Sequence, residues 1–367
     1  MKALILVGGF GTRLRPLTLS VLKPLVEFCN RPMLMHQIEA LVNAGVHTII
    51  LAINKEADCL EKEIRRMCKM VVENCKVEIV FSYEVEPLGT GKRGGPLAMA
   101  QEILGGSDEP FLVLNGDIVC KYPFEIMVEF HKSHGKEGTM AVTKVKEPSR
   151  FGAVVFNDRS GAVQRFVEKP FDFIANKVNA GMYVFNPSVL SRIKPQYTSL
   201  EMDIFPLMVD EGELYCIEVE GFWMDIGRPK DFLLGTQLYL EYLRLNNRLE
   251  RRDSPSIVGD VLIHPSVKIG NNCMIGPNVT LGPGVCIEDG VRIRDSAVLS
   301  GAVVRSHSWL GECIVGWNSE VGQWTRLENG TVLGENVHVN NEVLLNGALV
   351  LPHNSVSESV HEPQVIL

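Results

Sequence analysis

The chain opens with the apolar run Lys2-Ala-Leu-Ile-Leu-Val7, which leads directly into Gly8-Gly-Phe-Gly-Thr-Arg-Leu-Arg-Pro-Leu-Thr18. Such a run before clustered glycines predicts a buried strand that ends in a tight turn. Glycines let backbone N–H groups approach an anion, and nearby arginine and lysine side chains add positive charge. The stretch therefore predicts a nucleoside triphosphate site, although it lacks the Gly-Lys-Ser/Thr of a P-loop. The candidate residues are Gly8, Gly9, Gly11, Thr12, Arg13 and Lys23.

Residues 1–230 alternate between strand-like and helix-like segments. The expected strands are 3–7, 48–53, 77–82, 110–115 and 139–145, and the expected helices are 33–43, 58–72, 95–103 and 123–134. This alternation predicts an α/β fold with a mostly parallel, Rossmann-like sheet covered by helices. Ligands of such sheets bind at the carboxyl ends of the strands, which is where the loops at Gly8 and Asp117 would lie.

From Ile257 onward, the apolar residues recur with a period of six. One lane occupies positions 257, 263, 269, 275, 281, 287, 293 and 299, and a second lane lies two residues earlier in each repeat. This period is typical of a hexapeptide β-helix, whose triangular coils carry a short strand on each side. The first lane ends near Val303 while the second continues to Leu351, so we expect altered packing over 304–330.

Bulk properties limit the class of protein. A length of 367 residues suggests two domains or three, and we expect them at 1–250 and 256–352, followed by a tail at 353–367. The net charge of −8 argues against nucleic-acid or anionic-membrane binding, and no apolar run reaches the ~18 residues of a membrane span. Nine scattered cysteines without a Cys-x-x-Cys pair favour reduced thiols in the cytoplasm.

Two aspartates are candidate metal ligands. Asp117 ends the apolar run Phe111-Leu-Val-Leu-Asn-Gly-Asp117, and Asp225 lies in Gly221-Phe-Trp-Met-Asp-Ile-Gly227. A carboxylate at either place could hold Mg²⁺ against phosphate oxygens. The alternatives are a turn aspartate at Asp117 and a helix N-cap at Asp225. With the glycine-rich loop, the two carboxylates make a coherent site.

Glu168 and Lys169 are candidate ligands of a sugar phosphate. In a strand these neighbours would point to opposite sides, whereas a loop would let both reach one ligand. Lys169 would then bind the phosphate and Glu168 the sugar hydroxyls, the alternative being a surface salt bridge before Pro170. Asn179 could offer its amide to a sugar hydroxyl and Gly152 a backbone contact, the alternative at both positions being a turn.

The loop after the third strand is the candidate base-binding segment. Guanine presents two adjacent N–H donors, which a carboxylate of Glu84 or Glu86 could accept, with Gly89 and Thr90 following in the same loop. Solvated loop glutamates are the alternative.

With these motifs together, the chain resembles the sugar-1-phosphate nucleotidyltransferases and, over nearly its whole length, the mannose-1-phosphate guanylyltransferases among them. The resemblance rests on 8–24, 114–117, 166–170, 179–181 and 221–227, and on Ser306-His-Ser-Trp-Leu310 and Ile314-Val-Gly-Trp317 in the repeat region. It implies that Asp117 and Asp225 bind Mg²⁺ and nucleotide, and that Asp225 also belongs to the sugar-binding residues. It further implies that Lys169 is the active-site lysine and that the β-helix is left-handed.

The sequence departs from the family pattern at three places. Leu22-Lys-Pro24 replaces Pro-Lys-Pro, and Asn115-Gly-Asp117 replaces Asn-Ser-Asp. Gly89-Thr-Gly-Lys-Arg-Gly-Gly-Pro96 replaces a shorter Gly-Thr-Ala-Gly-Pro loop. This last loop faces the nucleotide in the family, so the base specificity stays open.

The implied reaction transfers GMP from GTP to mannose 1-phosphate, in a homo-oligomer that can have a related regulatory subunit as partner. Arg13 and Lys23 would hold the triphosphate. One alternative is the same chemistry on another base or sugar, and another is a regulatory subunit that binds sugar nucleotides without catalysis. The joint presence of Arg13, Lys23, Asp117, Lys169 and Asp225 favours an enzyme.

Overall fold

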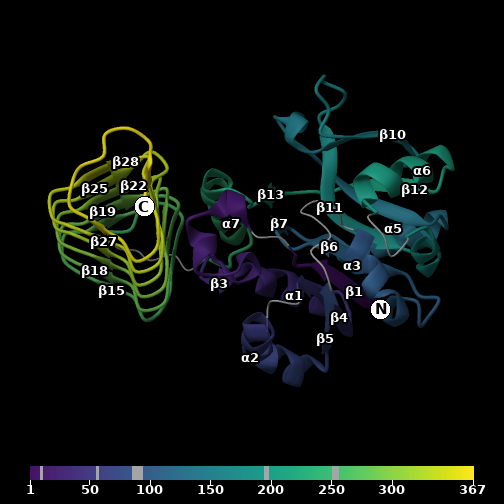
Figure 1. The fold of residues 1–367 in the computed structure, drawn as a ribbon, viewed down its shortest axis with the longest axis horizontal. Coiled ribbons are helices and arrows are strands. Elements are labelled where there is room, and N and C mark those ends of the chain that lie inside the picture. The colour runs from purple at the N-terminus through teal and green to yellow at the C-terminus, as the bar shows by residue number, and fades with distance from the viewer. Residues whose placement is uncertain (9–10, 55–57, 85–93, 194–197, 250–255) are drawn as a thin grey trace. The chain divides into compact units, whose positions relative to one another are not determined.

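The computed structural model describes residues 1–8, 11–54, 58–84, 94–193, 198–249 and 256–367 (Figure 1). Its contacts divide the chain into two compact units, neither of which is continuous in sequence. The first consists of Met1–Gly9 and Leu34–Trp223, and the second of Phe10–Met33 and Met224–Leu367. Among the described residues, no helix combines the length and the apolar character needed to cross a membrane.

The first unit is built on a nine-stranded sheet. Its parallel half has the order β6-β1-β4-β5, with β1 (Lys2–Leu6), β4 (Thr48–Asn54), β5 (Glu78–Glu84) and β6 (Phe111–Asn115). The other half contains β8 (Gly138–Lys144), β9 (Gly152–Phe156), β10 (Val163–Glu168), β11 (Lys177–Phe185) and β12 (Leu214–Glu218).

The expected parallel sheet is confirmed for its first four strands. The strand expected at 139–145 is β8, and it pairs antiparallel with β11, which is also antiparallel to β6 and β9. β9 and β10 form an antiparallel hairpin, because the short connection over 157–162 cannot make the long crossover that parallel pairing requires. The sheet is therefore mixed, and its parallel half carries the glycine-rich turn.

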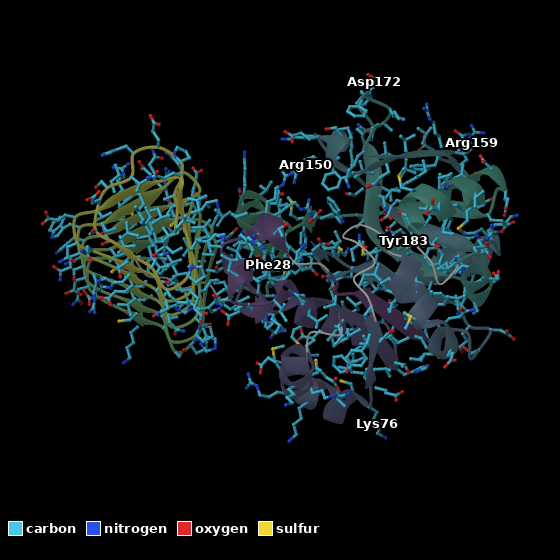
Figure 2. All side chains as sticks on the ribbon, in the orientation of Figure 1. Phe28, Lys76, Arg150, Arg159, Asp172 and Tyr183 are labelled. Atoms are coloured by element: carbon cyan, nitrogen blue, oxygen red, sulfur yellow. The ribbon has the colours of Figure 1, made fainter. Side chains whose placement is uncertain are left out.

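Helices pack against this sheet. They are α1 (Met33–Asn43), α2 (Asp58–Cys75), α3 (Gly94–Met99), α4 (Gln101–Leu104), α5 (Phe124–His134) and α6 (Phe205–Asp210), with short turns η4 (Pro148–Arg150), η5 (Pro187–Arg192) and η6 (Leu200–Ile204). α2 and α3 contact β5, and α5 contacts β8 and β11. The helix expected at 95–103 forms as two pieces, α3 and α4. Tyr183 (Figure 2) is fully buried and stacks on Phe185, with ring centroids 5.6 Å apart.

Two further short strands, β7 and β13, lie outside the nine-stranded sheet. β7 (Ile118–Cys120) follows Asp117, and β13 (Trp223–Asp225) carries the chain from the first unit into the second.

The second unit contains the β-helix, whose strands stack in three parallel sheets (Figure 1). One sheet has β14 (Val261–Ile263), β17 (Val279–Leu281), β20 (Ser296–Val298), β23 (Ile314–Val315), β26 (Val332–Leu333), β29 (Leu349–Val350) and β31 (Val365–Ile366). The second has β15 (Lys268–Ile269), β18 (Cys286–Ile287), β21 (Val303–Val304), β24 (Glu320–Val321), β27 (His338–Val339) and β30 (Ser355–Val356). The third has β16 (Met274–Ile275), β19 (Arg292–Arg294), β22 (Trp309–Gly311), β25 (Arg326–Glu328) and β28 (Leu344–Asn346).

The first apolar lane continues beyond Val303, contrary to the expectation from sequence. Val261 pairs with Val279, 18 residues later, but Leu281 pairs with Val298 and Val298 with Val315, each 17 residues later. Each 17-residue coil places the inward-facing residue one position earlier than a strict six-residue spacing predicts. After two such coils, the stack that contains Leu281 reaches Val315, which the spacing assigns to the second lane. Val315 is fully buried.

Residues 353–367, expected as a tail, continue the β-helix. β30 pairs with β27, and β31 pairs with β29. Val356 and Val360 are buried against the β-helix core, so the last coil closes the apolar interior.

The second unit also contains residues 11–33, which we call the arm, and α7 (Pro229–Leu245). The arm consists of three single turns, η1 (Thr12–Leu14), η2 (Leu17–Leu19) and η3 (Lys23–Leu25), and a hairpin of β2 (Glu27–Phe28) and β3 (Arg31–Pro32). Phe28 (Figure 2) is fully buried and makes edge contacts with Phe232 and Tyr239 of α7, at centroid distances of 5.3 and 5.8 Å. α7 in turn packs against β17.

Candidate active site

The glycine-rich turn after β1 supplies one crowded glycine and one open glycine. Gly11 has a φ of +60°, and a Cβ there would lie 2.9 Å from Cγ2 of Thr18 and 3.2 Å from Cβ of Lys23. Thr18 Oγ1 donates a hydrogen bond of 2.7 Å to the Gly11 carbonyl. No atom of the described residues lies within 4 Å of the Cβ position of Gly8, and Gly9 itself is not among those residues. Gly11 therefore fixes the fold of the arm, whereas Gly8 is open to a ligand.

The side chains of Arg13 and Asp225 both lie beside Gly227. A Cβ on Gly227 would lie 2.9 Å from Oδ1 of Asp225 and 3.0 Å from Nη2 of Arg13. Asp225 is half-buried, whereas Thr12 and Arg13 in η1 are exposed. The absence of a side chain at Gly227 thus leaves a cradle that the Arg13 guanidinium and the Asp225 carboxylate both border. Sequence reasoning singled out both charged residues but missed this glycine.

Asp117 follows β6 at the carboxyl edge of the parallel sheet. The Gly116 N–H donates to the Leu6 carbonyl at 3.1 Å, and a Cβ on Gly116 would lie 2.8 Å from that oxygen. This close approach of two strand ends is the local reason for glycine before Asp117.

A glutamine of α1 braces the same loop. Gln37 is 1% exposed, and its Nε2 donates to the carbonyls of Asn115 and Ile118 at 2.8 and 3.1 Å. Sequence reasoning did not select Gln37. The available signal was a polar residue between apolar neighbours on the buried face of an expected helix, where it needs partners.

Gly152, Glu168 and Lys169 lie together at the end of the β9–β10 hairpin. Glu168 pairs with Gly152 across the strands, and a Cβ on Gly152 would lie 2.9 Å from Oε2 of Glu168. Lys169 has a φ of +44°, and its Nζ lies 3.1 Å from Oε1 of Glu168. This left-handed residue ends the strand and brings both charged side chains to one side, as the loop interpretation requires. The salt bridge before Pro170 is also present.

Asn179 holds a bulge in β11. Its Nδ2 donates to the Tyr183 hydroxyl at 2.7 Å, and its Oδ1 accepts from the Gly181 N–H at 2.9 Å. The strand register shifts between Asn179 and Tyr183. A sugar hydroxyl would therefore have to share an amide that already organises the strand.

The described candidates thus form local groups within each unit. In the first unit, Gly152, Glu168 and Lys169 are in contact, while Asp117 lies on another loop of that unit. In the second unit, Arg13 and Asp225 both lie beside Gly227, and Lys23 lies beside Gly11. Glu86, Gly89 and Thr90 fall outside the described residues, as does the Glu84 side chain. Within the part of the chain that is described, no three His, Cys, Asp or Glu side chains gather as a metal site.

Comparison with protein families gives two adjacent matches. The model described as "Nucleotidyl transferase" matches residues 2–241, and "GMPPB C-terminal domain" matches residues 257–366.

Comparison with individual proteins gives full-length relatives. The chain is 56% identical to the mannose-1-phosphate guanylyltransferase catalytic subunit beta of Danio rerio and 58% identical to the mannose-1-phosphate guanyltransferase beta-A of Xenopus laevis, with 100% of each chain covered. The mannose-1-phosphate guanyltransferase of Schizosaccharomyces pombe is 53% identical, over 89% of this chain and 88% of that one. Among solved structures, a Bacillus anthracis chain described as a glucose-1-phosphate thymidylyltransferase matches with a TM-score of 0.57 and 21% identity, covering 69% of this chain and 98% of that one, which is a likeness of fold.

Proposed function

This chain belongs to the nucleotidyl transferase family and, within it, to the mannose-1-phosphate guanylyltransferases, so we propose that it transfers GMP from GTP to mannose 1-phosphate. The products are GDP-mannose and pyrophosphate. The observation that carries the residue assignments is that Arg13 and Asp225 both lie beside Gly227, because it brings the glycine-rich signature and the second candidate carboxylate into one local structure.

The sugar phosphate needs little chemical activation to attack the α-phosphorus. A phosphate monoester has its second pKa near ~6 and is largely dianionic at pH 7. Its approach to a triphosphate is opposed by charge repulsion, and catalysis of phosphoryl transfer rests mainly on positioning and electrostatic stabilisation. Arg13 and Lys23 would bind and orient the triphosphate, and no covalent enzyme intermediate is required.

Mg²⁺ fits the carboxylates of this site. Asp117 and Asp225 offer the hard oxygen donors that Mg²⁺ prefers, and Mg²⁺ commonly takes only one or two carboxylates beside phosphates and water. The cradle at Gly227 leaves space beside the Asp225 carboxylate. When bound, the ion supplies neutralisation of charge on phosphate oxygens.

The sugar-phosphate side of the site would use the end of the β9–β10 hairpin. The exposed Lys169 ammonium would bind the phosphate of mannose 1-phosphate, and the half-buried Glu168 carboxylate would accept from sugar hydroxyls. Gly152 keeps the strand beside Glu168 free of a side chain, and Asn179 would complete the sugar contacts from β11. Substrate would then replace the contact between Lys169 and Glu168.

The test measures pyrophosphate release from the full chain with Mg²⁺ and mannose 1-phosphate, with GTP, ATP, UTP, dTTP or CTP supplied separately. Release with GTP at least tenfold faster than with any other nucleotide is the expected result. Faster release with another nucleotide would reassign the base specificity, and with it the proposed roles of Glu86 and Gly89. No pyrophosphate release with any of the five nucleotides, from a folded protein that binds GDP-mannose, would favour a regulatory subunit.

We also propose a cytoplasmic homo-oligomer that can take a related regulatory subunit as partner. The eight cysteines that the structure describes are free thiols, as a reducing compartment would keep them. Val365 and Leu367, at the end of the β-helix, are 54% and 86% exposed, which supports an assembly contact there. Light scattering at several protein concentrations tests the oligomer.

A further inference from the structure

The arm has little regular structure of its own. Its turns η1, η2 and η3 have three residues each, and the strands of its hairpin have two each. Elements this short are held by tertiary contacts rather than by internal hydrogen-bond ladders. The geometry of Arg13 and Lys23 therefore depends on what the arm is attached to.

Three contacts attach the hairpin of the arm within the second unit. Phe28 is buried against α7, as described above. Asn30 Nδ2 donates to the Leu281 carbonyl at 2.9 Å. The Glu27 carboxylate accepts from Ser300 Oγ, at 2.8 Å to Oε1 and 2.6 Å to Oε2, and from the Ser300 N–H at 3.4 Å. Because Glu27 and Phe28 are neighbours in a strand, they point to opposite sides and grip two different surfaces.

Both polar contacts end on one sheet of the β-helix. Leu281 is the last residue of β17, and Ser300 follows β20, which is the next strand of the same sheet. A carboxylate that accepts from a hydroxyl and an N–H makes charge-assisted bonds, which are stronger than neutral ones and directional. The β-helix therefore offers the arm a rigid, two-coil support.

A short chain of contacts connects this support to the phosphate-binding candidates. The N–H of Val26, next to Glu27, donates to the Lys23 carbonyl at 3.2 Å and closes η3. Lys23 Cβ lies 3.2 Å from the Cβ position of Gly11, two residues before Arg13. A shift of Glu27 would thus be passed to Lys23 and to the turn that carries Arg13.

We propose that Glu27 and Ser300 are positioning residues, through which the β-helix holds Arg13 and Lys23 in place to receive the triphosphate of GTP. This inference rests on the proposed function. It assigns the β-helix a part in nucleotide affinity, and none in binding the phosphate of mannose 1-phosphate, because Lys169, the candidate for that phosphate, belongs to the first unit.

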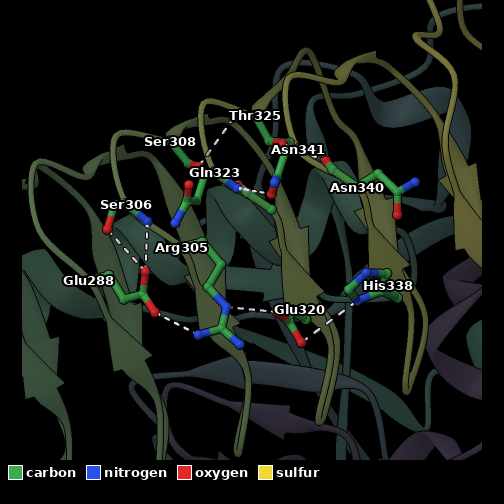
Figure 3. A network of polar contacts seen from close by, with 11 residues as sticks. Glu288, Arg305, Ser306, Ser308, Glu320, Gln323, Thr325, His338, Asn340 and Asn341 are labelled. Carbon is green, nitrogen blue, oxygen red and sulfur yellow. Dashed lines mark hydrogen bonds and ion pairs between the residues drawn. The ribbon is translucent and has the colours of Figure 1, made fainter.

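The test compares Ser300→Ala with Ser306→Ala, a matched variant in another serine–glutamate pair of the β-helix. Ser306 Oγ donates to Glu288 Oε2 at 3.0 Å, within a polar ladder that continues through Arg305 and Glu320 (Figure 3). Hydrogen–deuterium exchange of residues 11–26 is measured without ligand, and KM for each substrate and kcat are measured at steady state.

For Ser300→Ala we expect faster exchange over 11–26 and a KM for GTP about five- to tenfold higher, with kcat and the KM for mannose 1-phosphate within twofold of the wild type. Ser306→Ala should change none of these. Ser300→Thr, which keeps the hydroxyl, should restore most of the GTP affinity, and Glu27→Ala should add nothing to Ser300→Ala. Glu27→Gln serves as the second probe if Ser300→Ala does not fold.

Unchanged exchange over 11–26 in Ser300→Ala would overturn the inference and leave the proposed function intact. Faster exchange with an unchanged KM for GTP would overturn it differently, because the arm would then be held by Ser300 but Arg13 and Lys23 would not bind the triphosphate. An equal rise in both KM values would also overturn it, since the effect would not be confined to the nucleotide.

Discussion

At the scale of single residues, Gly227 decides whether Arg13 and Asp225 can keep their positions. A methyl group there would lie 2.9 and 3.0 Å from their terminal atoms, which is closer than van der Waals contact. Both atoms end flexible side chains, so they can move aside at small cost in stability. We therefore expect Gly227→Ala to lower kcat/KM for GTP by roughly 100-fold, the lower end of the ~10²–10³-fold loss that follows removal of one electrostatic contact in a transition state, while the melting temperature changes little.

The matched control is Gly106→Ala. Gly106 is not among the site candidates, and its nearest described neighbour would lie 3.4 Å from the added methyl group. Its kcat/KM should equal that of the wild type in the same pyrophosphate-release assay. A Gly227→Ala enzyme of normal activity would show that the two side chains do not need to keep these positions.

Side-chain geometry explains which site residues the sequence could predict. Asp225 is visible because a charge in an apolar setting is costly to bury unless it has a use. Arg13 is visible because it lies in a glycine-rich turn after a strand, which is typical of an anion site. The direction of Lys169 was not visible, since it depends on a φ of +44° at a residue that is not glycine. Gln37 was hidden for another reason, because its bonds go to backbone carbonyls about 80 residues away, as their residue numbers show.

At the scale of elements, the end of α5 carries a histidine pair that should make stability depend on pH. His134 stacks on Tyr215 with centroids 4.5 Å apart and packs edge-on against His131, while Glu213 and Lys136 are the other charged groups that act on it. Burial, and then the neighbouring His131, lower the pKa of His134 to about 4. Burial also lowers the pKa of His131, which bonds Thr139 at 2.9 Å.

Both histidines are therefore neutral in the folded protein at neutral pH. The unfolded chain binds more protons once the pH falls below the ordinary histidine value of 6.5, so the stabilisation is complete above pH 6.5 and is lost as the pH falls towards 4. We expect a loss of roughly 1–2 kcal/mol from His134, after discounting for its partial exposure to solvent. Denaturant unfolding at several pH values should show a flatter acid slope in His134→Gln than in the wild type. Equal slopes in the two proteins would contradict the assignment.

Element patterns were predictable where the chain repeats and ambiguous where it does not. Six-residue spacing identified the β-helix, because each coil must place an apolar side chain inside at the same point. The 17-residue coils were visible only as the end of the first lane near Val303, because each contains one step of five residues and two such steps move the inward position into the numbering of the second lane. The antiparallel pairing of β8 was equally hidden, because strand composition does not record direction.

At the scale of the whole molecule, the sequence suggested two consecutive domains. The contacts instead group residues 11–33 with the C-terminal part of the chain, so that neither unit is continuous in sequence. The arm and α7 group with the β-helix because Phe28 packs on α7 and because Glu27 and Asn30 bond to β-helix residues. The two polar contacts join residues about 250 positions apart, as the residue numbers show, so no local sequence pattern could predict them.

This organisation predicts that removal of the last coil lowers stability without changing how the arm is held. A chain that stops at Pro352 loses β30 and β31 and the buried side chains Val356 and Val360, each worth roughly 1.5–3 kcal/mol of apolar burial. Coils of a solenoid contact only their neighbours. The coils at Leu281 and Ser300, which hold the arm, should therefore keep their structure. We expect a lower melting temperature and more binding of a hydrophobic dye, but an unchanged KM for GTP. An unchanged melting temperature would mean that these residues are a peripheral tail, and a raised KM would mean that the β-helix acts on the arm as one cooperative body rather than coil by coil.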